Sequence, residues 1–218
     1  MKPIIFSPKM VAAIINGSKT MTRRVIRPQP DKDDPCIRFV TWEGFPTYFG
    51  NHAKVIIQTE EGEDKEVKPY EVGDILWVRE TWCNINKPGI KPEYHYFADN
   101  FICDFEDYDP KEWKWKPSIH MRQEAARLFL KVEKIRIERL QKISPEDCVA
   151  EGAVKKPHYM KYGGEKCLVD HKRYIEEFEI LWDSINGERK NGIYSWKENP
   201  FVWVYEFKIH KITGGEFL

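Results

Sequence analysis

The chain has 218 residues, enough for one large or two small domains, and its 35 basic and 35 acidic residues give a formal net charge of zero. A contact with nucleic acid would therefore need a local basic patch, because the net charge supplies no attraction. The cysteines lack a CxxC pair, the apolar N-terminus is short, and no apolar run reaches membrane length, which predicts a cytoplasmic protein without a membrane partner.

The first elements expected along the chain are a short strand at residues 4–6 and a helix that ends at Ile15. The Ser7-Pro8 dipeptide combines an N-cap with a proline at the first helical position, which is a strong start signal. The Asn16-Gly17 dipeptide predicts the end of this helix, since glycine takes the left-handed conformation without steric cost. Residues 18–24 would then lead from the helix into a strand.

The middle of the chain contains further β-prone segments. Residues 54–59 are one strand candidate, and residues 94–98 are another. Between them, residues 73–82 read GDILWVRETW, which predicts a turn followed by a strand through Trp82. Alternation along that strand would place Arg79 on one face and Glu80 with Trp82 on the other.

The C-terminal half begins with the clearest half-buried strand, residues 128–140, where apolar and charged residues alternate. The Ser144-Pro145 dipeptide then opens a short helix that Gly152 ends. Residues 169–185 have apolar side chains at helical spacing and predict an amphipathic helix. The largely apolar start of the strand predicted at 201–209 indicates a central position in a sheet.

Many short strands with a few helices favour the α+β class, with a small barrel or strongly bent sheet and helices around it. No segment has the composition of an interdomain linker. We therefore expect a single domain, residues 1–218, with insertions around 84–118 and 153–167. Within the second insertion, residues 155–166 are expected to form a basic, glycine-rich loop.

Lys19 and Thr22 are the first candidate site residues, in the passage from helix to strand. A free hydroxyl is a poor nucleophile and needs an adjacent base, and a lysine can serve if burial or neighbouring cations lower its pKa. The alternative is a basic helix C-terminus favoured by the helix dipole. Arg23 and Arg24 would point to opposite faces of a strand, and period-two counting puts Arg24 beside Thr22. There Arg24 could hold a phosphate or carbonyl, or be an ordinary surface arginine.

Glu151 is the most unusual acid, because it follows a helix whose other acids lie at its start. A carboxylate at the end of a helix opposes the dipole at a cost of about 0.3–1 kcal/mol. That position favours a specific partner such as Lys19, or a role in proton transfer. The alternative is an exposed acid.

Two aromatic segments could contact a nucleobase. The first offers Arg79, Glu80 and Trp82, and the second is a basic and aromatic cluster. The cluster consists of Trp113, Lys114, Trp115, Lys116, His120 and Arg122. Stacking on aromatic rings holds nucleobases with little sequence preference, whereas the alternative for both segments is packing in the core.

No cofactor and no metal site is expected. Cys167 and His171 are the only close Cys/His pair, and no second pair follows at zinc spacing. Walker, GxGxxG and GxSxG motifs are absent from the sequence.

Four motifs together resemble the ASCH family, whose fold is PUA-like, a small β-barrel related to RNA-binding modules. They are GxKxxTxR at 17–24, GDxLWVRETW at 73–82, ISxEDxxxEG at 143–152 and WVxEF at 203–207. The resemblance covers nearly the whole chain. It is closest to longer, prophage-associated members, which share the WKPSIHM segment at 115–121.

The resemblance implies an RNA or nucleoside ligand. Compact bacterial ASCH proteins are amidohydrolases that deacetylate N4-acetylcytidine, and their catalytic lysine, threonine and glutamate match Lys19, Thr22 and Glu151. From their side-chain chemistry, the candidates for contact with substrate or RNA are Arg24, Arg23, Arg79, Glu80, Trp82 and His120. This chain is about twice as long as the compact enzymes, so the inserted middle could cover or reshape the pocket. A non-catalytic RNA-binding module and a ribonuclease are the alternatives.

Overall fold

The computed structural model describes residues 1–30, 37–40, 54–59, 62–67, 70–85, 93–101, 114–154, 157–162 and 165–213. Parts of both predicted insertions lie outside these ranges, namely residues 86–92, 102–113, 155–156 and 163–164. The chain divides into two compact units. Unit 1 contains Met1–Thr20, Asp74–Val132 and Phe207–Leu218, and unit 2 contains Met21–Gly73 and Glu133–Glu206.

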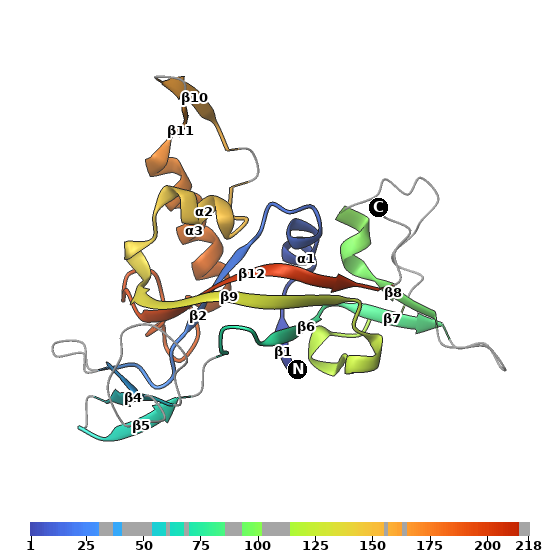
Figure 1. The fold of residues 1–218 in the computed structure, drawn as a ribbon, viewed down its shortest axis with the longest axis horizontal. Coiled ribbons are helices and arrows are strands. Elements are labelled where there is room, and N and C mark those ends of the chain that lie inside the picture. Colours follow the sequence, from blue (N-terminus) through green and yellow to red (C-terminus); the bar gives the residue numbers. More distant parts are fainter. Residues whose placement is uncertain are drawn as a thin grey trace. The chain divides into compact units, whose positions relative to one another are not determined.

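Unit 1 combines strands with one helix and three 3₁₀ turns (Figure 1). Its elements are β1 (Lys2–Ile5), α1 (Pro8–Ile15), β6 (Ile75–Arg79), β7 (Trp82–Ile85), β8 (Glu93–Tyr96), η1 (Phe97–Phe101), η2 (Ser118–His120) and η3 (Gln123–Ala125), with the first part of β9 (Leu128–Arg139) and the last part of β12 (Phe201–Ile212). β1 runs parallel to β6, and β6 is antiparallel to β9. β7 and β8 form a separate antiparallel pair.

Local capping explains the limits of α1. The Ser7 side chain accepts a hydrogen bond from the backbone nitrogen of Met10, as an N-cap should. At the other end Gly17 has φ of +78°, a left-handed conformation that glycine adopts without steric cost. Both predicted signals are confirmed. Buried Val11 and Ile14 give the helix its core-facing side.

Unit 2 contains the remaining strands and the two other α-helices. Its elements are β2 (Met21–Val25), β3 (Ile37–Val40), β4 (Lys54–Gln58), β5 (Asp64–Val67), η4 (Leu140–Lys142), α2 (Pro145–Ala150), β10 (Tyr159–Tyr162), β11 (Glu165–Leu168) and α3 (His171–Asn186), with the second part of β9 and the first part of β12. The apolar side of α3, which includes Tyr174, Phe178 and Trp182, packs into one buried cluster with Val202 and Val204 of β12.

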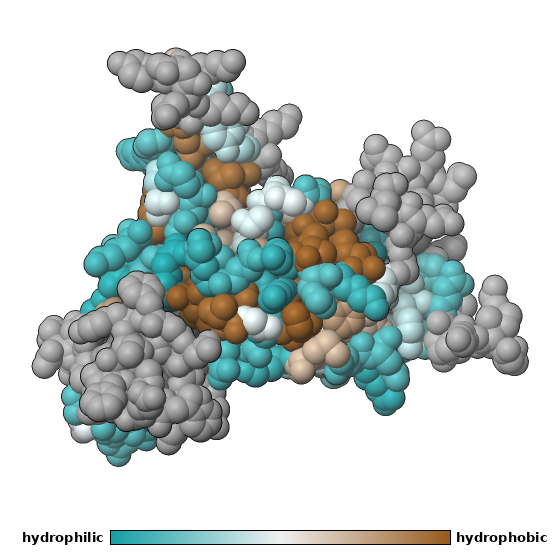
Figure 2. All heavy atoms as spheres, in the orientation of Figure 1, coloured by the Kyte–Doolittle hydropathy of each residue, from teal (hydrophilic) through white to brown (hydrophobic). Residues whose placement is uncertain are grey.

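The α+β class is confirmed. The largest sheet has the order β1-β6-β9-β12-β2, so β12 is a central strand, as its apolar start predicts. Across the described ranges no sheet closes into a barrel. None of the helices in these ranges is long and apolar enough to cross a membrane. On the face shown in Figure 2, hydrophilic residues surround a hydrophobic patch that lies over α1 of unit 1.

Two predicted elements are wrong in detail. The strand expected through Trp82 ends at Arg79, because the backbone nitrogen of Glu80 bonds Met121 Sδ at 3.3 Å instead of a neighbouring strand. The segment expected as a loop at 155–166 instead contributes to the antiparallel pair β10–β11. A Gly-Gly connection between two β-prone runs is itself a hairpin signal.

Candidate functional site

β2 carries three of the candidate residues of unit 2. In its register with β12, Thr22 lies opposite Tyr205 and Arg24 lies opposite Trp203. Because side chains alternate along a strand, these four residues share one face of the sheet, and Arg23 lies on the other face. The period-two expectation for this segment is therefore confirmed by its extended conformation.

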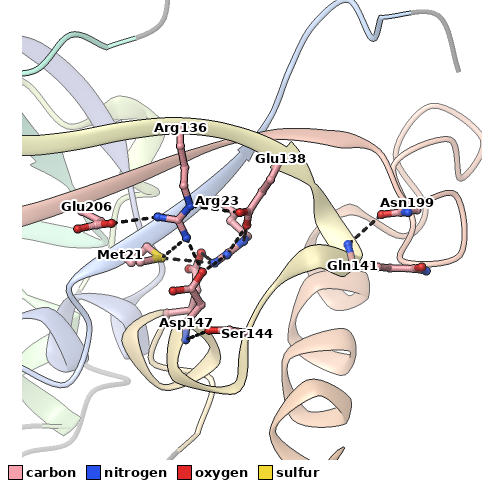
Figure 3. Close-up of polar contacts among 10 residues, drawn as sticks. Met21, Arg23, Arg136, Glu138, Gln141, Ser144, Asp147, Asn199 and Glu206 are labelled. Atoms are coloured by element: carbon pink, nitrogen blue, oxygen red, sulfur yellow. Dashed lines mark hydrogen bonds and ion pairs between the residues drawn. The ribbon is translucent and has the colours of Figure 1, made fainter. Parts of the chain in front are cut away.

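Arg23 is buried among carboxylates (Figure 3). Its Nη2 lies 2.5 Å from both Glu138 Oε1 and Asp147 Oδ2, and its Nη1 lies 3.2 Å from Glu151 Oε1. Burial by itself lowers the pKa of Arg23, but the charges of Glu151 and Glu138 and the hydrogen bonds outweigh it, so the pKa is raised. The guanidinium is held charged by three separate acids.

Arg136 extends this group of charges, as Figure 3 shows. It pairs with Asp147, with Glu138 at 3.1 Å and with Glu206 at 3.0 Å. Asp147 and Glu138 therefore bridge Arg23 to Arg136. We call these two arginines and their carboxylates (Glu138, Asp147, Glu151 and Glu206) the Arg23 network. It ties the start of α2 to β2, β9 and β12 within unit 2.

Glu151 caps the C-terminal end of α2 and is 4% exposed. Its backbone nitrogen bonds Asp147 O at 2.8 Å, and its carboxylate accepts a hydrogen bond from Arg23 Nη1. The position of Glu151 predicted a specific partner, and the guanidinium of Arg23 is such a partner. Its positive charge offsets the unfavourable interaction of the carboxylate with the helix dipole. Burial lowers the pKa of Arg24, and the negative charge of Glu151 opposes that shift.

The face of β2 that carries Thr22 is lined with aromatic rings. Thr22 is 4% exposed, beside the buried rings of Trp203 and Tyr205. Tyr205 packs on Tyr70 with ring centroids 5.1 Å apart, and its hydroxyl accepts a hydrogen bond from the Tyr70 backbone nitrogen. A hydroxyl, a guanidinium and flat apolar surface therefore occur together on one face of unit 2.

Lys19 belongs to unit 1 and is 1% exposed. Its backbone nitrogen bonds Ala13 O at 2.9 Å, which continues the C-terminal turn of α1. Its Nζ lies 5.7 Å from the centroid of the Phe6 ring, within the range of a cation–π contact. Burial distinguishes Lys19 from an ordinary basic residue at a helix end.

Arg79 and Glu80 of unit 1 have different surroundings. Arg79 Nε bonds Ser118 O at 3.1 Å, and its guanidinium lies over the Trp77 ring. Glu80 is fully buried, and both its oxygens bond Arg127 at 3.1 Å. Burial raises the pKa of Glu80, and the charge of Arg127 opposes that shift. This pair has the geometry of a core ion pair.

Trp82 and His120 are brought together in unit 1. They line a pocket of about 370 Å³ with Asn84, Tyr94, Lys116, Arg122 and Glu124, which we call the Trp82 pocket. Three members of the predicted basic and aromatic cluster thus contribute to one cavity, namely Lys116, His120 and Arg122. Trp113 of that cluster lies outside the described residues.

Sequence reasoning missed the partners of the candidate residues. Glu138, Arg136 and Tyr205 carry no motif of their own, and only strand pairing brings them to β2. Asp147 had a local signal, but as a helix N-terminal acid. Among the described residues, no group of three or more His, Cys, Asp or Glu side chains is arranged to hold a metal ion.

Comparisons of the chain with protein-family models, with curated proteins and with solved structures found no match.

Proposed function

We propose that this chain is a PUA-like ASCH protein that acts on an RNA-derived ligand, as an amidohydrolase that deacetylates N4-acetylcytidine. The observation that supports the proposal is burial. Lys19, Thr22 and Glu151 are 1%, 4% and 4% exposed, so all three residues named by the family resemblance are withdrawn from water. Lysine and glutamate are almost never fully buried unless they are paired, so the burial of Lys19 and Glu151 indicates specific contacts and not an ordinary surface position.

The proposed chemistry is acyl transfer to a threonine. By the family resemblance, Lys19 accepts the hydroxyl proton of Thr22 as the threonine Oγ forms a bond to the acetyl carbon. The bond between that carbon and N4 then breaks, and cytidine leaves with a proton on N4 that Glu151, the match to the family's glutamate, helps to transfer. Water finally hydrolyses the acetyl ester, which releases acetate and restores the threonine.

The arginines receive separate roles in this proposal. Arg24 shares the face of Thr22, so it is suited to hold an oxygen of the substrate. Arg23 already bonds three acids, so we assign it to positioning Glu151 and not to ligand binding. The proposed acyl transfer assigns no step to Arg79, Glu80, Trp82 or His120, and Arg79 and Glu80 already bond Ser118 O and Arg127.

The test is release of cytidine from N4-acetylcytidine, followed by chromatography. We expect release by the unmodified protein, and loss of at least about 100-fold in Lys19→Ala, Thr22→Ala or Glu151→Gln. Matched controls are Lys9→Ala, Thr20→Ala and Glu146→Gln, since these residues are exposed. No release, or equal loss in the controls, would sink the proposal.

A non-catalytic RNA-binding module is the second candidate, supported by the guanidinium of Arg24 on an aromatic face of unit 2. It predicts salt-dependent binding of RNA without turnover, weakened by Arg24→Met or Arg79→Met. The third candidate, a ribonuclease, would be recognised by cleavage of RNA in the same assay.

A further inference from the structure

The Trp82 pocket has features that acyl transfer leaves unused, and all its residues belong to unit 1. Its volume of about 370 Å³ lies within the range of small-molecule sites. We propose that it binds the nucleobase and phosphate of a nucleotide, either free or as one residue of single-stranded RNA.

The aromatic side of the pocket fits a flat ring, because Tyr94 is half-buried and packs against Trp82, which is itself held in a buried cluster with Tyr96 and Met121. The ring centroids of Trp82 and Tyr94 lie 5.8 Å apart, and the ring planes are inclined at 56°. The two rings are therefore tilted and do not stack in parallel. Stacking on an aromatic side chain stabilises the binding of any base, because every base has a flat π-face. Tyr94 is only half-buried, which leaves part of this wall open to a ligand.

The rim of the pocket fits a phosphate. The pocket lining includes the basic side chains of Lys116 and Arg122 and the imidazole of His120, against the single carboxylate of Glu124. The Arg122 side chain is 81% exposed, and its pairing with Glu124 is long, at 3.8 Å. Such an exposed pair costs little to separate, so the guanidinium can turn to an anion.

The backbone fixes Lys116 beside Trp82. Their backbone nitrogens and oxygens bond each other in both directions, at 3.2 and 2.7 Å. Lys116 Nζ lies 4.7 Å from the centroid of the Trp82 ring and donates to Asn84 Oδ1. The ammonium is thus held near the aromatic wall before any ligand arrives, which lowers the entropy cost of binding.

The indole of Trp82 adds an independent sign of a ligand. Trp82 is 7% exposed, and among the described residues its buried Nε1 finds no hydrogen-bond acceptor. A buried donor without a partner destabilises the folded protein, and such groups are rare in native proteins. A base or phosphate oxygen would satisfy this donor.

Binding is tested with AMP, with single-stranded pentaadenylate, and with adenosine and ribose 5-phosphate as the separated halves of AMP. The readouts are calorimetry and the assigned indole N–H resonance of Trp82. We expect AMP or pentaadenylate to shift that resonance and to bind at least about fivefold more tightly than either half, which corresponds to about 1 kcal/mol. Tighter binding of pentaadenylate than of AMP would identify RNA as the source of the nucleotide.

Two exposed residues provide the variants, and Lys114→Met is the control two positions away. Lys116→Met should weaken AMP binding about tenfold, and Arg122→Gln should weaken it severalfold, while the control binds as the unmodified protein does. No shift of the Trp82 resonance, or AMP binding that Lys116→Met leaves unchanged, would overturn the proposal. Repeating the titration in Thr22→Ala separates this pocket from the proposed amidohydrolase site.

Discussion

Arg23 is the residue whose loss should be felt most in unit 2. It is buried and its guanidinium is shared by Glu138, Asp147 and Glu151. Removing one partner from a buried ion pair leaves an uncompensated charge and typically costs 3–5 kcal/mol. We therefore expect Arg23→Met to lower the free energy of unfolding in urea by about 3–5 kcal/mol.

The control for Arg23 is Arg173→Met. Arg173 also pairs with a carboxylate, Glu177 at 2.8 Å, but its side chain is 57% exposed. Exposed pairs of this spacing contribute little to stability, so Arg173→Met should leave the free energy of unfolding nearly unchanged. Equal losses in the two variants would contradict the structural role of the Arg23 network.

At the same scale, motif reading found residues but not their surroundings. Lys19, Thr22 and Glu151 were named from residue type and spacing, and all three are buried. The acids that surround Arg23 could not be found in this way, since Glu138 and Glu151 are 115 and 128 positions away in the chain. Such contacts depend on strand register, which no local pattern specifies.

At the scale of elements, the start of α2 gives a prediction. Ser144 Oγ accepts a hydrogen bond from the Asp147 backbone nitrogen at 3.1 Å, and Asp147 is also a partner of Arg23. Loss of a serine N-cap costs about 1 kcal/mol. Ser144→Ala should therefore lower the free energy of unfolding by about 1 kcal/mol or more, because the cap also orients an acid of the Arg23 network.

Ser184→Ala is the matched control, because Ser184 is exposed within α3 and bonds only its own helix among the contacts seen, at Leu181 O. A change within about 0.5 kcal/mol is expected there. If both serine variants lose the same stability, the cap is not what holds the start of α2.

Short sequence signals predicted where helices begin and end, because these limits depend on residues that are close together in the chain. The N-caps Ser7 and Ser144, and the glycines that end α1 and α2, gave helix limits that the structure confirms. The break after β6 was missed because it depends on Met121, a residue 41 positions away from Glu80. The β10–β11 pair differs from the predicted loop because the β-prone residues on either side of the Gly-Gly dipeptide favour a hairpin, whereas the charge and glycine content of the segment favour a loop.

For the whole molecule, the division into units could not be predicted from composition. The chain passes between units after Thr20, Gly73, Val132 and Glu206, so neither unit is a continuous segment. Two of these passages fall inside the long strands β9 and β12, where no linker composition can occur. The single domain expected from the sequence stays a prediction.

Buried titratable groups in both units make a common prediction about alkaline pH. Burial raises the pKa of the Cys148 thiol in unit 2 to about 12, and it raises the pKa of Cys83 and Tyr96 in unit 1. Each group keeps its proton in the folded state at a pH where the unfolded chain has lost it. The folded state then binds more protons, so the free energy of unfolding must fall as pH rises.

The window for Cys148 follows from its two pKa values, 9.0 as the ordinary value and about 12 in the folded protein. The stabilisation that Cys148 gives the folded protein is fully present below the ordinary pKa and is lost progressively as pH rises above it. The free energy of unfolding should therefore fall by about 1 kcal/mol between pH 8 and 10 on account of this thiol. Urea unfolding at these two pH values should show a decline that Cys148→Ala reduces by about that amount. Ser184→Ala is the control, because this exposed serine does not ionise in this pH range and its replacement should leave the decline unchanged. A decline that Cys148→Ala does not alter would mean that the thiol ionises in the folded protein nearly as readily as in the unfolded chain.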